Sequence, residues 1–259
     1  MKMKVFMYIL LTLIVKTAAA NDSCSVYGCP TGGPSSNQVI ERTIYTLSNN
    51  KTTKFADWVA YKVTPTTIDG PSRSRNFRSD PAISSSNTLE TSDYRDANAI
   101  LRTDRGHQVP LAAFSNTDDW RDTNFLSNIT PQSSNLNQGP WVRLETAVRN
   151  HARSGNEVFV ISGPLYETFF GTLPQADESH SIPSGYFKIV ATISNSGFVR
   201  AAAFVMEQDS QRGDDFCAKE TTINEIEERS GLNVFPGFSF NKEFAVETRL
   251  GGIGSGLGC

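Results

Sequence analysis

Asp104-Arg105-Gly106-His107, with Asn137 and Glu145 following in the same part of the chain, is the most informative stretch of this 259-residue sequence. It brings together an arginine, a histidine, a neutral amide and a carboxylate. The glycine permits an unusual backbone turn, and in an extended segment the arginine and the histidine point to the same face. Such a set is typical of a site that hydrolyses a phosphodiester with one hydrated Mg²⁺.

Each of the main candidates also has a structural interpretation. His107 has the side chain best suited to take a proton from water near neutral pH, although a lone histidine is more often structural. Asn137 opens a predicted helix, where it acts either as a helix cap or as the Mg²⁺ ligand. Glu145 lies two helical turns further on, either as a solvated glutamate or as a group that hydrogen-bonds metal-bound water.

Weaker candidates surround this stretch. Asn128 and Gln132 bracket a turn at 129–131 and are candidates for orienting a phosphate or the Asn137 side chain. Asp104 is a further candidate for a supporting role in the site. Asn128 also begins a glycosylation sequon, a short pattern that is frequent by chance. His151 and His180 have no matching partners nearby in the sequence and are interpreted as structural.

Residues 1–20 have the pattern of a secretory signal peptide. Two early lysines precede an apolar run, and Ala18-Ala19-Ala20 fits a signal-peptidase site, which predicts cleavage before Asn21 and export from the cell. A retained membrane anchor is the alternative, although the apolar run is short for a membrane span. Residues 21–259 show no linker with a shift in composition, which predicts one large domain.

The charge of the chain argues against tight, non-specific binding of nucleic acid. Without the three lysines of the leader, 21 basic and 27 acidic side chains leave a net charge of −6 on residues 21–259. A protein that binds nucleic acid tightly is usually basic. Between residues 71 and 153, however, there are ten arginines and no lysine, and arginine offers a rigid two-pronged fork for phosphate. Pairing with nearby acids is the alternative for these arginines.

Several hydrolase classes are disfavoured by missing motifs. The sequence has no Gly-x-Ser-x-Gly elbow, no phosphate-cradling Walker loop and no His-Glu-x-x-His helix. The four cysteines lie outside the central stretch, and an even number in an exported chain favours disulfides over a zinc site. We pair Cys24 with Cys29, and Cys217 with Cys259, the second bridge fixing a glycine-rich tail.

The apolar patterns predict an α+β fold. Strands are expected at 40–47, 58–63, 158–161, 187–193 and 198–206, the last two joined by a turn at 195–197. Helices are expected from Leu136 to about Arg153 and over 222–230, with Thr222 and Glu225 as a capping pair. Residues 21–38 and 65–87 are predicted to be irregular. Because strands and helices do not alternate regularly, α+β is favoured over a doubly wound parallel sheet.

The sequence resembles the DNA/RNA non-specific endonuclease family, close to its secreted Serratia-type members. The resemblance rests on Asp104-Arg105-Gly106-His107-Gln108, on 126–132 and on 136–145. Further blocks match at 29–33, 52–56, 162–167 and 215–217, so it spans nearly the whole mature chain.

This resemblance implies a ββα-metal (His-Me finger) core within a larger domain that has a central antiparallel sheet flanked by helices. It implies Mg²⁺-dependent cleavage of single- and double-stranded DNA and RNA that leaves 5′-phosphorylated products, with Mn²⁺ as a candidate substitute. By position, His107 is the general base, Asn137 the metal ligand and Glu145 the residue that orders the metal's water shell. The phosphate contacts and their supporting residues are Arg105, Arg75, Asn128, Gln132 and Arg149. Relatives of this kind are often homodimers.

These observations predict a secreted endonuclease that tolerates both sugars. A non-catalytic module that adheres to extracellular nucleic acid is the alternative. A binding module has no need to keep a base, a metal ligand and a water-ordering acid together, so the enzyme is favoured.

Overall fold

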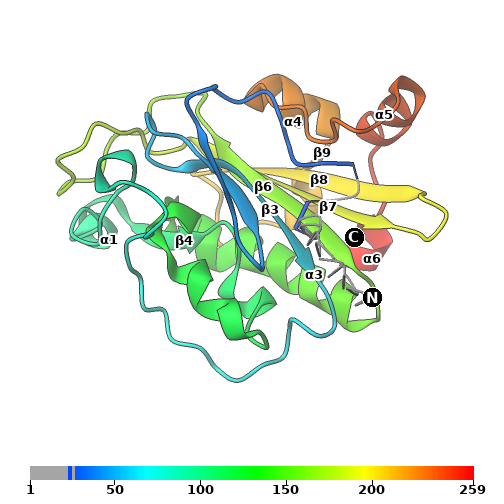
Figure 1. The fold of residues 1–259 in the computed structure, drawn as a ribbon, viewed down its shortest axis with the longest axis horizontal. Helices are drawn as coiled ribbons and strands as arrows, with labels where there is room; N and C mark the ends of the chain where they lie inside the picture. Colours follow the sequence, from blue (N-terminus) through cyan, green and yellow to red (C-terminus); the bar gives the residue numbers. More distant parts are fainter. Residues whose placement is uncertain (1–22, 25–26) are drawn as a thin grey trace, which may run out of the picture.

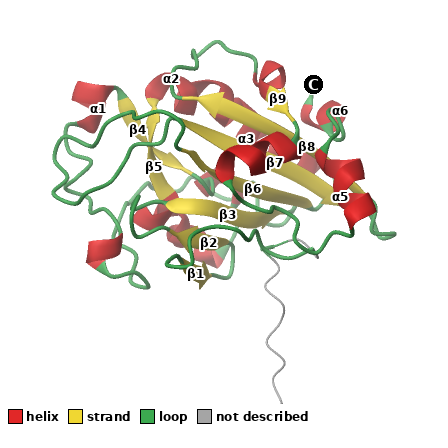
Figure 2. Ribbon diagram, turned by 90° about the horizontal axis from the view of Figure 1, so that it is seen from above, coloured by secondary structure: helices red, strands yellow, loops and turns green. Residues whose placement is uncertain are grey.

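A large antiparallel sheet forms the centre of the protein, as seen in the computed structural model, which describes residues 23–24 and 27–259 (Figures 1 and 2). Its strand order is β1-β2-β3-β6-β7-β8-β9, and every neighbouring pair is antiparallel. The strands are β1 (Gln38–Glu41), β2 (Thr46–Asn49), β3 (Ala56–Val63), β6 (Val158–Leu165), β7 (Gly185–Ile193), β8 (Val199–Glu207) and β9 (Glu220–Thr221).

A second, two-stranded sheet carries the central motif. It pairs β4 (Thr103–His107) with β5 (Ile129–Ser133) in antiparallel register. The α-helices are α1 (Ala97–Leu101), α2 (Ser134–Leu136), α3 (Val142–Arg153), α4 (Ile223–Ser230), α5 (Phe240–Glu247) and α6 (Gly254–Leu257). None of the helices in the described ranges is long and apolar enough to cross a membrane.

Helices cover the large sheet on both faces, with α3 on one side and α4 and α5 on the other (Figure 1). Alternate residues of each strand therefore pack into different cores. In β3, Val59 and Tyr61 join the cluster that contains Leu144 of α3, whereas Trp58 packs with Ile226 of α4. This arrangement confirms the α+β prediction of a central antiparallel sheet flanked by helices.

Most predicted strands are confirmed, with two corrections. The segment 40–47 is not one strand but the end of β1, a turn and the start of β2. The N–H of Arg42 donates to the carbonyl of Tyr45 at 2.8 Å and closes this turn, which the apolar pattern does not mark. The strand predicted at 158–161 continues as β6 to Leu165. The turn at 195–197 is confirmed: Gly197 has φ +75° and its N–H bonds to Ser194.

The helix predicted from Leu136 is regular only from Val142. Asn137–Trp141 forms a π-type turn, because Pro140 has no N–H to donate and Gly139 adopts φ −115°, ψ −117°. Cap residue Thr222 of α4 accepts the N–H of Glu225 at 3.1 Å, as predicted, and Gly231 ends that helix with φ +72°.

Both predicted disulfides are present, Cys24–Cys29 and Cys217–Cys259. The second joins the segment after β8 to the residue that follows α6. The predicted signal peptide and its cleavage before Asn21 lie outside the described residues. Of the segments predicted to be irregular, 21–38 and 65–87, the described residues have no helix or regular strand except Gln38, which begins β1, and Ser85–Asn87, which form one turn of 3-10 helix.

Candidate active site

A pocket of about 1190 Å³ opens between β4, the start of α3 and the loop that precedes α1. Seven of the residues singled out in the sequence line it: Arg75, Asp104, Arg105, His107, Asn137, Glu145 and Arg149. Arg105 and His107 lie on the same side of β4 because alternate residues of an extended strand share a face. Residues from four separate segments therefore meet in one cavity.

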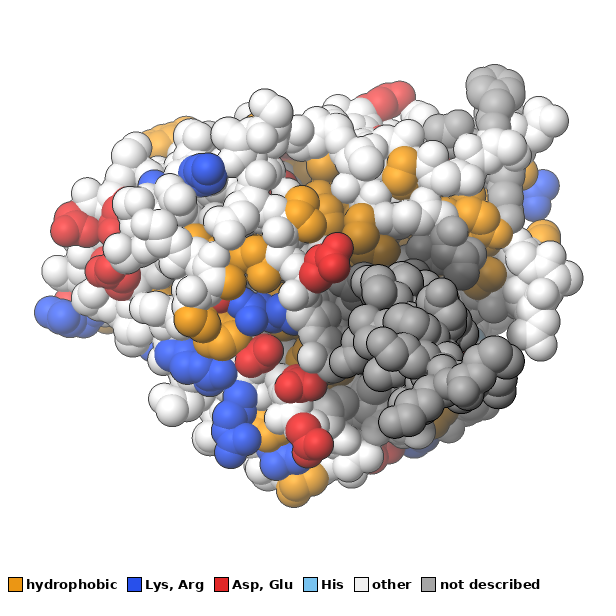
Figure 3. Space-filling model, in the orientation of Figure 1, with side chains coloured by type: hydrophobic (Ala, Val, Ile, Leu, Met, Phe, Trp, Pro, Cys, Tyr) orange, Lys and Arg blue, Asp and Glu red, His pale blue; other side chains and the backbone are white. Residues whose placement is uncertain are grey.

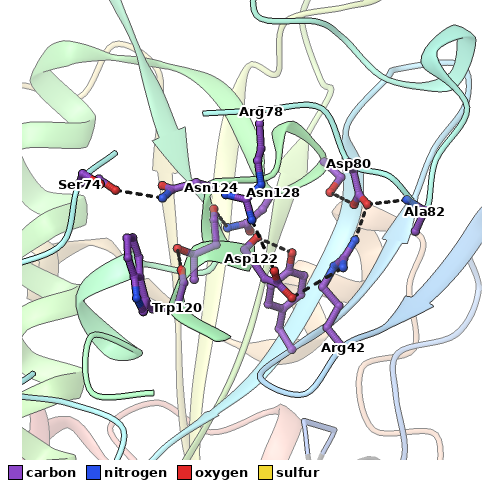
Figure 4. A network of polar contacts seen from close by, with 12 residues as sticks. Arg42, Ser74, Arg78, Asp80, Ala82, Trp120, Asp122, Asn124 and Asn128 are labelled. Atoms are coloured by element: carbon purple, nitrogen blue, oxygen red, sulfur yellow. Dashed lines mark hydrogen bonds and ion pairs between the residues drawn. The ribbon is translucent and has the colours of Figure 1, made fainter. Parts of the chain in front are cut away.

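Asn124 fixes His107 in one orientation. His107 Nε2 lies 3.1 Å from Asn124 Oδ1, and Asn124 Nδ2 donates to the carbonyl of Ser74 at 3.1 Å. The amide nitrogen is thus committed to a carbonyl, so the amide oxygen faces the imidazole and accepts a hydrogen bond from the Nε2–H group. Figure 4 shows Asn124 directed at Ser74. This contact leaves His107 Nδ1 as the unprotonated nitrogen.

The environment of His107 favours the neutral imidazole. Burial lowers the pKa of His107 to about 4, and the positive charge of Arg75 acts in the same direction, while the hydrogen bond with Asn124 opposes both. The edge of the ring still reaches the pocket. The imidazole is therefore unprotonated at neutral pH, with one ring nitrogen available to accept a proton.

A polar network behind the histidine fixes the loop that carries Arg73 and Arg75 (Figure 4). The N–H of Arg78 donates to the carbonyl of Asn124 at 3.1 Å, which ties this loop to the residue that contacts His107. Arg42 donates to Asp80, and Asp122 lies 3.8 Å from Arg42 and 3.7 Å from Arg78. One connected network therefore supports both Asn124, which contacts His107, and the loop that carries Arg75.

Asp104 determines which way the Asn137 amide faces. Its Oδ2 accepts hydrogen bonds from Asn137 Nδ2 at 2.9 Å and from Gln138 Nε2 at 2.7 Å, and its Oδ1 accepts from Ser134 Oγ at 2.7 Å. Burial acts to raise the pKa of Asp104, but these hydrogen bonds outweigh it and the pKa lies below its ordinary value. With the amide nitrogen held by a carboxylate, Asn137 Oδ1 is left as a ligand atom for a cation.

Glu145 and Arg149 lie one turn apart on α3. Burial raises the pKa of Glu145, and the positive charges of Lys188, Arg149 and Arg75 oppose that rise. Arg149 donates to Thr146 Oγ1 at 2.9 Å, and its buried Nη1 has no hydrogen-bond partner within the described chain. This nitrogen can donate to an anion that enters the pocket.

The arginine of the central motif is held by aromatic rings. The guanidinium of Arg105 lies 5.3 Å from the centre of the Phe77 ring and 5.5 Å from that of Tyr94, and it donates to the carbonyl of Thr91 at 3.2 Å. Stacking of this kind restricts a guanidinium without neutralising its charge. Arg75 is more exposed and lines the same pocket.

Asn128 and Gln132 lie behind the pocket rather than in its wall. Asn128 is fully buried: its Oδ1 accepts the N–H of Val109 at 2.8 Å, and its Nδ2 donates to the carbonyl of Thr123 at 2.8 Å. It thus joins the chain just after His107 to the 3-10 segment that ends at Asn124, instead of orienting Asn137, and burial makes its sequon inaccessible in the folded state. Gln132 packs against Gly106, so closely that a Cβ added at residue 106 would lie only 2.0 Å from Gln132 Oε1.

Sequence reasoning missed Asn124, Phe77 and Tyr94. No motif marks Asn124, because its contact with the histidine depends on the path of a 3-10 segment that ends 17 residues after His107. Phe77 and Tyr94 resemble ordinary core aromatics, and only the fold brings them against Arg105. His180 is structural, as predicted: its Nε2 accepts the N–H of Leu173 at 2.8 Å.

A group of acidic side chains elsewhere could hold a metal by geometry. Glu90, Asp93 and Glu178 place carboxylate oxygens within 4.8 Å of one another. None of the three lines the pocket. The pocket itself offers an amide oxygen and separate carboxylates rather than such a cluster.

Comparison of the sequence with known proteins agrees with this geometry. The family model of DNA/RNA non-specific endonucleases matches residues 25–241. A nuclease of Serratia marcescens is 43% identical over 245 residues, which cover 94% of this chain and 91% of the relative. The mitochondrial endonuclease G of Homo sapiens is 30% identical over 196 residues, covering 68% and 61% of the two chains.

The fold is also similar to a solved structure. A chain in the crystal structure of the EndoG/EndoGI complex aligns with a TM-score of 0.70 and 20% identity, covering 83% of this chain and 91% of that chain. This likeness concerns the fold alone, whereas the sequence matches extend over most of the chain. The chain belongs to the DNA/RNA non-specific endonuclease family.

Proposed function

We propose that this member of a family of hydrolytic nucleases is a secreted, sugar-non-specific endonuclease that uses one hydrated Mg²⁺ and His107 as the general base. The observation that carries the proposal is the pocket itself. It holds a neutral histidine with a free Nδ1, an amide oxygen oriented by Asp104 and four arginines, among them Arg75, Arg105 and Arg149. Together they provide a base, a cation ligand and positive charge for a phosphate.

His107 would remove a proton through Nδ1 from the water that attacks phosphorus. Asn124 keeps the proton on Nε2, so the lone pair of Nδ1 is available throughout. In-line attack with departure of the 3′ oxygen leaves the phosphate on the 5′ side of the next nucleotide. The products would therefore be 5′-phosphorylated oligonucleotides.

The donor atoms of the pocket fit Mg²⁺. Asn137 Oδ1 accepts no hydrogen bond from the described residues and is the proposed direct ligand, while Glu145 is placed to accept hydrogen bonds from the ion's waters. Oxygen donors suit this hard cation, which keeps most of its waters, and Mn²⁺ would be a substitute. When bound, the ion would stabilise the negative charge that develops on the phosphate oxygens.

The arginines account for broad substrate use. Arg75, Arg105 and Arg149 present guanidinium groups to the pocket, and guanidinium matches phosphate geometry. Phosphate contacts carry no base information and are common to DNA and RNA. Single- and double-stranded DNA and RNA without strong sequence preference are thus the proposed substrates.

Export and assembly belong to the same proposal. Residues 1–20 would act as a signal peptide cleaved before Asn21, leaving 21–259 as the endonuclease domain. Two disulfides are in keeping with an oxidising, extracellular location. Assembly into a homodimer is proposed by analogy with the family.

A non-catalytic nucleic-acid-binding module is the second candidate. Its strongest support would be a uniformly basic surface. On the face shown in Figure 3, however, Lys and Arg side chains gather at the lower left with acidic side chains among them. A mixed surface and a net negative charge suit an enzyme that releases its product better than a tight binder.

Incubation of the mature protein with circular plasmid DNA and with RNA tests the proposal, in Mg²⁺ and in EDTA. Mg²⁺-dependent internal cuts in both substrates, lost in His107→Ala, are expected. His151→Ala, which changes a histidine outside the pocket, serves as the matched control and should cut normally. Intact substrates that are nevertheless shifted on a gel by a folded protein would support the binding module instead.

A further inference from the structure

Lys188 is a fully buried lysine beneath the catalytic helix. It lies in β7, opposite Ser162 of β6 and Phe204 of β8, and its side chain is 0% exposed. In β7 its side chain lies on the same face as those of Tyr186 and Val190, which pack in the core on the α3 side of the sheet. The ammonium group therefore points toward the helix that carries Glu145, and not toward solvent.

Aromatic side chains surround this ammonium group. Nζ donates to Tyr61 Oη at 3.2 Å and lies 4.2 Å from the centre of the Trp141 ring. Tyr61, Trp141 and Leu144 belong to the same buried cluster. A charge in such a place is costly unless another charge compensates it, because the surroundings cannot replace its hydration.

Glu145 follows Trp141 by four residues, about one helical turn, so the ammonium group over the Trp141 ring lies on the side of the chain that carries this carboxylate. Burial lowers the pKa of Lys188 to about 8, and the Glu145 carboxylate opposes that fall. Among the groups that lower the pKa of Glu145 against its own burial, Lys188 is the strongest, ahead of Arg149, Arg75 and Trp141. Trp141 interacts with both groups, since its ring lies 4.2 Å from Lys188 Nζ and its side chain is among the groups that lower the pKa of Glu145.

We propose that Lys188 is a positioning residue of the reaction, a buried cation that keeps Glu145 ionised and directed into the pocket. This inference rests on the proposed function, since Glu145 can accept hydrogen bonds from metal-bound water only as a carboxylate. Lys188 does not line the pocket and would touch neither substrate nor metal. Its partners Tyr61 and Trp141 hold the ammonium group at the base of α3.

Lys188→Met tests this role, because methionine has a similar length and no charge. The pKa of Glu145, measured by NMR of the ¹³C-labelled carboxyl group in metal-free protein, should rise. The acid limb of the kcat/KM profile should move to higher pH, and kcat/KM at neutral pH should fall by roughly 10- to 100-fold. Lys188→Arg, which keeps the charge, should recover part of the loss.

Lys62→Met is the matched control. Lys62 also carries its ammonium beside an aromatic ring, 5.9 Å from the centre of Phe159, and it pairs with Glu157 at 3.3 Å away from the pocket. The control should leave both the pKa of Glu145 and the pH profile unchanged. If Lys188 only filled space in the core, the Lys188→Met variant would also keep the wild-type pKa of Glu145 and the wild-type pH profile.

The reciprocal variant decides the question if Lys188→Met does not fold. In Glu145→Gln, the pKa of Lys188 should fall below its wild-type value, and an unchanged value would overturn the inference. An active wild-type enzyme whose Lys188→Met variant keeps the wild-type pH profile would also overturn it. A wild-type protein without Mg²⁺-dependent nuclease activity would instead overturn the proposed function, a separate result.

Discussion

At the scale of single residues, the pocket depends on amides whose orientation is fixed by a second partner. Asn124 gives its nitrogen to the Ser74 carbonyl and its oxygen to His107, and Asn137 gives its nitrogen to Asp104. In both cases the partner selects which atom faces the reactive group. A substitution of the partner should therefore impair the reaction without removing any reacting atom.

Asn124→Ala tests this idea at the base. Without the amide oxygen, the proton of His107 can reside on Nδ1, which removes the lone pair that the reaction needs. We expect kcat to fall by about 10- to 100-fold, as for other hydrogen-bond partners that orient a reacting side chain. Asn116→Ala, which removes an exposed asparagine bonded to the Thr66 carbonyl, is the control and should keep wild-type kcat. Equal rates in the two variants would refute the role of Asn124.

The low pKa of His107 predicts how activity and stability respond to acid. With a folded-state pKa of about 4, the base stays neutral below its ordinary value of 6.5, so the acid limb of kcat/KM should lie below pH 6.5. Between pH 6.5 and about 4, the unfolded chain binds a proton that the folded protein does not. The free energy of unfolding should therefore decrease as the pH falls through this window.

Urea unfolding at several pH values, compared with His107→Gln, measures that contribution. The variant has no titrating imidazole at this position, so its stability should depend less steeply on pH between 6.5 and 4. Parallel pH dependences would show that burial does not depress the pKa of this histidine.

At the scale of the elements, the β4–β5 ladder supports the pocket through a close contact between Gly106 and Gln132. Any Cβ at residue 106 would meet the glutamine side chain, with Oε1 only 2.0 Å away. The glycine is required here by this close approach.

Gly106→Ala should therefore lower the free energy of unfolding by about 1–3 kcal/mol, the usual cost of overpacking. Gln132→Ala in the same chain should restore part of the loss, because it removes the atoms that the new methyl group meets. Gly213→Ala, where nothing lies within 4 Å of the added carbon, is the control and should change stability by less than about 0.5 kcal/mol. Chemical denaturation of wild type, Gly106→Ala, the Gly106→Ala/Gln132→Ala double variant and Gly213→Ala measures these changes in the free energy of unfolding.

The elements that could be predicted from the sequence are those with an uninterrupted apolar pattern. Strands β3, β7 and β8 and the helix α4 follow from alternation, turn residues and caps. The pattern failed at 40–47, where one backbone hydrogen bond at Arg42 turns the chain, and at Pro140, which breaks the first turns of the predicted helix. Strand β5 was not expected because it is short and contains Pro131.

The pocket residues on β4 and α3 were predictable because they lie in short sequence blocks whose residue types suit the chemistry and resemble the family pattern. Asn124 and Lys188 were not, since their roles depend on contacts between segments far apart in the sequence. Periodicity assigns Lys188 to a strand, but only the packing of Trp141 and Tyr61 shows that its charge is buried beside Glu145.

At the scale of the whole molecule, the Cys217–Cys259 disulfide fixes the end of the chain. It spans 42 residues and keeps α6 close to α3, where Ile253 and Leu257 join the core. Neither cysteine lines the pocket. The bridge should therefore contribute to stability and not to chemistry.

Replacing both cysteines by serine should lower the free energy of unfolding by ~4 kcal/mol in the chain-entropy model. The Cys24–Cys29 bridge closes a much shorter loop, so the same replacement there should lower the free energy of unfolding by only ~2 kcal/mol. Denaturant unfolding measures both losses, and kcat at 25 °C should stay near the wild-type value in each variant. A larger loss from the short bridge would contradict the assignment.

The central claim is that His107 supplies the base and Asn137 the metal ligand, and one titration separates the two. Initial rates of cleavage are measured on matched DNA and RNA over a range of Mg²⁺ concentrations for wild type, His107→Ala and Asn137→Ala. His107→Ala should lower the maximal rate by about 10²- to 10⁴-fold on both substrates without moving the Mg²⁺ midpoint. Asn137→Ala should move the midpoint to higher Mg²⁺ or abolish activity. Wild-type rates in the first variant, or an unchanged metal dependence in the second, would contradict the account.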